Sequence, residues 1–142
     1  MQSDTSPISI LLPRAAPVAP SQRLLLYTIR RIGAHGLSDA HATNAMLTTF
    51  GRSYRRPLIL LRAFMAESAR ASKLTIRIVA CCCGRMTRDE TMLVDALVLA
   101  VNDPQAAHQL LTRCLGTPDC LGALTSAQAL NQAFADLGRP LS

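Results

Sequence analysis

Apolar residues recur at helical spacing along most of the chain after residue 20. Leu25, Ile29 and Ile32 fall on one face of a first predicted helix, while Arg23 and Arg30 lie together on another face. The same spacing predicts further helices over residues 38–50, 57–71, 88–102, 104–115 and 126–137. We therefore expect a mainly α, single-domain helical bundle of five or six helices.

The ends of these helices are indicated by residues that cap a helix or interrupt it. Three serines are the predicted N-caps of the first, second and last helices: Ser21, Ser38 and Ser126. Pro57 suits the first turn of the third helix, and Asp103 followed by Pro104 suits the start of the helix over 104–115.

The predicted helix over 88–102 is apolar on nearly every side, which is typical of a helix in the middle of a bundle. Thr87 and Glu90 have the spacing of a capping box at its start. Asp95 belongs to its narrow polar stripe. This carboxylate therefore either reaches the surface or pairs with a buried arginine such as Arg62 or Arg77.

Two stretches do not have helical spacing. Residues 74–80 alternate with a period of two and predict a short strand or extended segment that leads into Cys81–Cys83. Residues 1–20 contain four prolines and predict a flexible N-terminal arm, so the helical domain is expected to span 21–142. Within the arm, the apolar positions 8, 10 and 12 would suit a short edge strand.

Composition narrows the class of protein further. Hydrophobic residues make up 49% of the 142 positions and only five residues are aromatic, so we expect an aliphatic core between helices. No uncharged apolar run approaches the roughly 18–20 residues needed to cross a bilayer. The N-terminus also lacks the cationic start of a secretory signal, and the expected location is the cytoplasm.

Five cysteines, three of them adjacent, favour free thiols in a reducing compartment over a disulfide scaffold. One hypothesis is a metal site of four thiolates, which would suit zinc or an iron–sulfur cluster: Cys81, Cys83, Cys114 and Cys120. Their spacing matches no standard C-x2-C knuckle, and Cys114 also fits an apolar core stripe. A second hypothesis is a redox thiol within the vicinal group Cys81, Cys82 and Cys83.

The net charge of +6 is distributed unevenly. Residues 21–88 carry twelve basic and two acidic side chains, whereas residues 89–142 carry two basic and six acidic ones. Arg52, Arg55 and Arg56 are mixed with the aromatic residues Phe50 and Tyr54 and could contact the phosphates of a nucleic acid. The alternative is that the acidic C-terminal third folds back and neutralises the basic middle.

Two segments resemble a family of small bacterial proteins known only as a domain of unknown function. They are Arg56-Pro-Leu-Ile-Leu-Leu-Arg-Ala-Phe-Met-Ala-Glu-Ser-Ala-Arg70 and Cys81-Cys-Cys-Gly-Arg-Met-Thr-Arg-Asp-Glu90. The similarity runs from about residue 21 to 141. It implies a standalone intracellular protein and carries no activity or site residue.

The sequence leaves three hypotheses for function. The first is a small cytoplasmic, non-enzymatic regulatory or interaction protein, which binds a protein partner or self-associates through apolar helix faces. The second is a thiol-based redox or metal-binding protein that uses Cys81–Cys83. The third is a nucleic-acid-binding protein that uses the arginine-rich segment 52–56.

Overall fold

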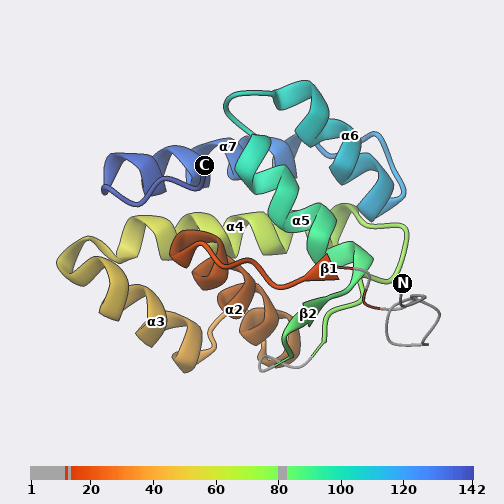
Figure 1. The fold of residues 1–142 in the computed structure, drawn as a ribbon. Helices are drawn as coiled ribbons and strands as arrows, with labels where there is room; N and C mark the ends of the chain where they lie inside the picture. The colour runs from red at the N-terminus through yellow and green to blue at the C-terminus, as the bar shows by residue number, and fades with distance from the viewer. Residues whose placement is uncertain (1–11, 13, 80–82) are drawn as a thin grey trace, which may run out of the picture.

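The computed structural model describes Leu12 and residues 14–79 and 83–142 (Figure 1). The described residues form six α-helices, a short 3-10 helix η1 (Gly51–Ser53) and one two-stranded sheet. The helices are α2 (Pro20–His35), α3 (Ala40–Phe50), α4 (Arg55–Ala71), α5 (Arg88–Leu99), α6 (Pro104–Leu115) and α7 (Leu121–Asp136). The predicted mainly α fold of five or six helices is therefore confirmed.

Helix α4 is the axis of the bundle. It packs along α7 on one side and contacts α2 and α3 on the other (Figure 1). Helix α5 crosses the centre and contacts α2, α6 and α7. The core between these helices is aliphatic, as the scarcity of aromatic residues predicts, and Phe50 and Phe134 form one edge-to-face pair with their ring centroids 5.0 Å apart.

The start of α5 agrees with the sequence-based prediction. Thr87 accepts a hydrogen bond from the backbone of Glu90, and the Glu90 carboxylate accepts one from the backbone of Thr87, which completes the capping box. The helix ends at Leu99, three residues before the predicted end. Asp95 lies at the surface, where it forms an ion pair of 2.7 Å with Arg14.

The buried alternative for Asp95, with Arg62 or Arg77 as its partner, is wrong. Arg62 instead donates to the backbone carbonyl of Leu37, and the backbone N–H of Arg77 donates to Asp89. The Arg14 guanidinium reaches Asp95 because strand β1, which contains Arg14, lies beside the start of α5. A charge pair at the surface avoids the desolvation cost that a buried one carries.

The three predicted serine N-caps are wrong. Helix α2 begins at Pro20, whose fixed φ suits the first helical position, so Ser21 already lies inside the helix. Helix α3 is capped by Asp39, which accepts from the backbone of Ala42. Helix α7 begins at Leu121, and Ser126 lies within it; the helix already lies against Glu67 of α4 at Gly122.

The sheet does not form where a strand was predicted. Residues 75–79 belong to neither a helix nor a strand, so the predicted strand is wrong for this part of 74–80, and the extended alternative stays a prediction. Pairing occurs instead between β1 (Arg14–Ala15) and β2 (Arg85–Met86), which run antiparallel. Residues 1–11 lie outside the described part, and the flexible arm and the edge strand within it stay predictions. None of the described helices is both long and apolar enough to cross a membrane.

Asp39 gives the turn between α2 and α3 a measurable pH dependence. The Arg31 guanidinium donates two hydrogen bonds to Asp39 and lowers the pKa of that carboxyl from 3.8 to about 2. The resulting stabilisation is fully present above about pH 4 and is lost as the pH falls through 2, since the unfolded chain binds the proton first. We expect Asp39→Asn to flatten the stability–pH curve between these values, measured by urea unfolding followed by circular dichroism.

Arg31→Gln is the matched variant for this test, because it removes the guanidinium and leaves the Asp39 carboxyl in place. It should flatten the same part of the curve. An Asp39→Asn protein that retains the slope of the original protein between pH 4 and pH 2 would contradict the assignment.

Candidate functional site

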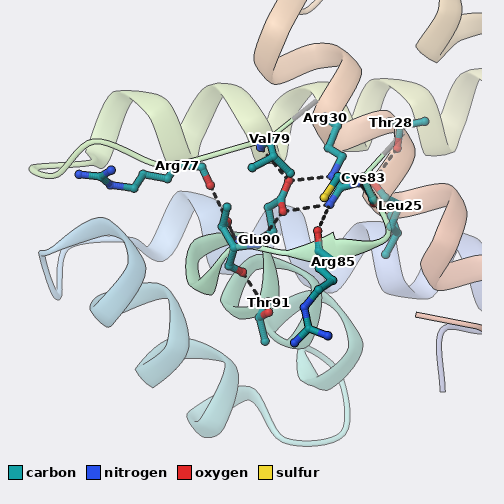
Figure 2. A network of polar contacts seen from close by, with 10 residues as sticks. Leu25, Thr28, Arg30, Arg77, Val79, Cys83, Arg85, Glu90 and Thr91 are labelled. Carbon is teal, nitrogen blue, oxygen red and sulfur yellow. Dashed lines mark hydrogen bonds and ion pairs between the residues drawn. The ribbon is translucent and has the colours of Figure 1, made fainter. Parts of the chain in front are cut away.

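Of the three adjacent cysteines, only Cys83 lies within the described residues, where it is half-buried. It follows residues 72–79, which form neither helix nor strand, after the gap at 80–82, and it precedes strand β2 and the capping box of α5. Its neighbourhood is a network of polar contacts (Figure 2).

Arg30 of α2 is the centre of this network (Figure 2). Its guanidinium is 2% exposed and donates through all three of its nitrogens. Nε donates to Glu90 Oε2 at 2.8 Å, Nη1 to the carbonyl of Cys83 at 2.6 Å, and Nη2 to the carbonyl of Arg85 at 2.7 Å. A buried guanidinium requires such partners because its desolvation is costly.

The Glu90 carboxylate is fully buried and accepts four hydrogen bonds from three residues. Besides Arg30, which contacts both of its oxygens, it accepts from the backbone N–H of Thr87 at 2.8 Å and of Val79 at 3.2 Å. The same carboxylate therefore completes the capping box of α5, neutralises the Arg30 guanidinium and binds the backbone of residues 72–79 at Val79. Buried charges are stable when paired and hydrogen-bonded in this way.

Two further contacts attach residues 72–79 to the start of α5. The Thr87 hydroxyl donates to the carbonyl of Arg77 at 2.6 Å, and the Arg77 backbone N–H donates to Asp89 at 2.7 Å. Together with the bond from Val79, these bonds fix the chain that precedes residues 80–82, and Arg30 fixes the chain that follows them at Cys83 and Arg85. The charged groups of Arg30 and Glu90 pair with each other, so the network holds the described chain in place on both sides of these residues.

Of the four predicted metal ligands, Cys83 is half-buried, Cys114 and Cys120 are buried, and Cys81 lies outside the described residues. Cys114 is buried in α6, where its thiol approaches the backbone carbonyl of Asp89 at 3.9 Å. Cys120 is buried before α7, close to Thr112 and the carbonyl of Pro118. No group of three or more His, Cys, Asp or Glu side chains within the described part of the chain is arranged to hold a metal ion. With Cys81 outside that part, the metal and redox hypotheses stay predictions.

Arg52, Arg55 and Arg56 come together around η1 and the start of α4, and all three are exposed. The Arg55 guanidinium lies 6.0 Å from the centroid of the Tyr54 ring. Arg56 forms an ion pair of 3.0 Å with Asp136 of α7. An acidic residue of the C-terminal third thus neutralises one arginine of this cluster. This contact agrees with the alternative in which the acidic third folds back onto the basic middle of the chain.

Sequence reasoning missed Arg30, which it placed on a polar face of the first helix with Arg23. In the structure, Arg23 is exposed and Arg30 is buried. One signal was available: Leu26 lies one turn before Arg30 and is itself buried, so the two share an inward face. Glu90 was found as a cap, but its role as a buried ion-pair partner was not.

Removing the Glu90 carboxylate should be strongly destabilising. Glu90→Ala leaves the Arg30 guanidinium buried without its counter-charge, and we expect the free energy of unfolding to fall by about 3–5 kcal/mol. Urea unfolding followed by circular dichroism measures this change. Asp136→Ala is the matched control, because it removes the carboxylate of an exposed pair and should have far less effect.

A double-mutant cycle separates the ion pair from the other contacts of Glu90. Arg30→Met and Glu90→Gln together should cost less than the sum of the two single changes, because each single change leaves one charge unpaired. Additive effects, or a Glu90→Ala protein no less stable than Asp136→Ala, would show that the pair does not stabilise the chain around Val79 and Cys83.

Cys114 should be chemically inert in the folded protein. Burial, and secondarily the charge of Asp89, raises the pKa of its thiol to about 12, so only about one molecule in ten thousand carries the thiolate at pH 8. We expect iodoacetamide to leave Cys114 unmodified at pH 8, as read by peptide mass spectrometry, and to modify it after unfolding in urea. Modification at the same rate in both states would refute its placement in the core.

Comparison with known proteins identifies the family. The family model described as "Family of unknown function (DUF6628)" matches residues 3–138. No curated protein and no solved structure shows significant similarity to the chain. The resemblance to a family of unknown function, suggested by residues 56–70 and 81–90, is thereby confirmed. Because the match covers nearly the whole sequence, the chain belongs to the family of unknown function DUF6628.

Proposed function

We propose that this protein is a small, non-enzymatic interaction protein that binds a protein partner through a surface on α3 and α4. The observation that carries the proposal is a group of large apolar side chains exposed on these helices and in the turn before α3. Leu37, Leu47 and Ile59 expose 42%, 46% and 59% of their surface, and we call this surface the α3–α4 face. Clusters of such side chains, unlike isolated ones, are typical of binding surfaces.

Arg62 connects the parts of the α3–α4 face. Its Nε donates to the carbonyl of Leu37 at 2.7 Å, and its Nη2 donates to the Thr43 hydroxyl at 3.1 Å. Leu47 follows Thr43 by one turn of α3, and Ile59 precedes Arg62 by nearly one turn of α4. Residues three or four apart share a helix face, so the apolar side chains belong to the same surface as Arg62.

The charge around this face favours an acidic partner over a second copy of the chain. Helix α3 carries no Asp, Glu, Lys or Arg, whereas Arg55 and Arg62 of α4 lie on either side of Ile59. Two copies that met through this face would bring like charges together, which opposes association. An apolar surface with a positive rim instead suits an amphipathic helix whose polar side is acidic.

The test compares two pairs of substitutions in the full chain. Leu47→Glu/Ile59→Glu alters the α3–α4 face, and Val101→Glu/Leu121→Glu makes the same change at exposed apolar residues elsewhere. Each tagged protein captures partners from an extract of its source cells, and quantitative mass spectrometry measures the recovery. We expect at least one protein whose recovery falls roughly tenfold with the first pair only, about 1.4 kcal/mol in binding free energy.

Two outcomes would contradict the proposal. One is recovery that falls equally with both pairs, since the α3–α4 face would then have no special role. The other is capture that disappears after nuclease treatment and depends on Arg52 and Arg55, which would favour the nucleic-acid hypothesis. Circular dichroism spectra of all variants verify that the helical fold is intact.

A further inference from the structure

A mostly apolar groove of about 1050 Å³ lies along residues 74–79. Leu12 and the first residues of α5 also line it. Leu74, the first of the residues along the groove, leaves 56% of its surface exposed. An apolar hollow that stays exposed is typical of a surface that binds another molecule.

The chain along the groove is held at both of its ends. Next to Leu74, the Lys73 backbone N–H donates to the Leu115 carbonyl at 2.7 Å. Toward the other end, the backbone N–H groups of Arg77 and Val79 donate to carboxylates at the start of α5. A ligand therefore meets walls that are already in place, and binding does not have to order them.

Two exposed arginines, Arg77 and Arg88, line the groove. Neither forms an ion pair with another residue in the described part of the chain. The Arg77 side chain points away from the network of Arg30 and Glu90 (Figure 2). Asp89 also lines the groove, but its carboxylate accepts the Arg77 backbone N–H. Because a guanidinium pairs best with a carboxylate or a phosphate, the groove favours an acidic ligand.

The backbone along the groove also has hydrogen-bonding groups to offer. Thr75, Ile76 and Ile78 line the groove, and their N–H and C=O groups form no hydrogen bond with any other described residue. An extended peptide brings donors and acceptors along its own backbone, whereas the acyl chain of a lipid brings none. These groups therefore favour a peptide over a lipid as the occupant.

We propose that the groove binds an extended segment of a partner protein in which apolar side chains are flanked by Asp or Glu. The apolar side chains of this segment contact Leu74 and Val79, and its carboxylates pair with Arg77 and Arg88. Its backbone bonds to residues 75–78, as in recognition by strand addition. This extended ligand differs from the amphipathic helix of the α3–α4 face, and the two sites share no residue.

Random peptides displayed on phage are the probe for this site. They are selected on the full-length Leu47→Glu/Ile59→Glu protein, so that the α3–α4 face does not contribute. We expect the enriched peptides to combine apolar residues with Asp or Glu. In backbone amide NMR, such a peptide should shift the signals of Thr75, Ile76 and Ile78 and slow the hydrogen exchange of these amides.

Fluorescence anisotropy of the labelled peptides measures the contribution of the two arginines. Arg77→Gln/Arg88→Gln should weaken binding roughly tenfold, because it removes two exposed ion pairs with the peptide. Arg52→Gln/Arg55→Gln is the matched control: it removes the same charge from exposed arginines elsewhere and should leave the affinity unchanged. Circular dichroism verifies that both variants keep the helical fold.

Three results would overturn the proposal. The first is a selection without enriched peptides, and amide shifts caused by palmitate alone would then identify a lipid carboxylate as the occupant. The second is an equal loss of affinity with both pairs of substitutions, which would show only a general attraction between charges. The third is a set of amide shifts confined to residues outside 74–79 and 87–89, which would place the peptide elsewhere.

Discussion

The buried ion pair between Arg30 and Glu90 is the interaction on which the arrangement of the bundle depends. It joins α2 to α5 across sixty residues of sequence, and both side chains are almost fully removed from water. The desolvation of two charges is repaid only when the remaining donors and acceptors are satisfied. Here they are satisfied by the backbone at Val79, Cys83 and Arg85, so the pair dictates the course of the irregular chain around it.

This constraint explains why a segment without regular structure is well placed. Residues 75–79 form neither helix nor strand, yet Arg77 and Val79 donate their backbone N–H groups to carboxylates at the start of α5. These carboxylates accept the backbone hydrogen bonds that a neighbouring strand would accept in a sheet. Because the Glu90 carboxylate also completes the capping box of α5, its loss would release both the helix end and residues 75–79.

Local patterns in the sequence predicted the helices well, and long-range contacts account for the errors. The capping box at Thr87 and the start of α6 at Asp103 depend on residues three apart, so spacing alone reveals them. The start of α7 depends on packing against α4, and the serine within it gave a false cap. Helical spacing places Leu26 on the same face as Arg30, but the partner that permits burial of the charge lies sixty residues away, and helical spacing says nothing about such a distance.

The α3–α4 face is connected to the buried ion pair through the end of α2. Leu37 of that face follows Gly33 by four residues, and the Ile78 side chain lies so close to Gly33 that a Cβ there would come within 2.8 Å of it. Ile78 belongs to the segment whose backbone N–H groups donate to the carboxylates at the start of α5. Coupling between a partner on the α3–α4 face and the chain around the ion pair would therefore pass through the end of α2 rather than along α4.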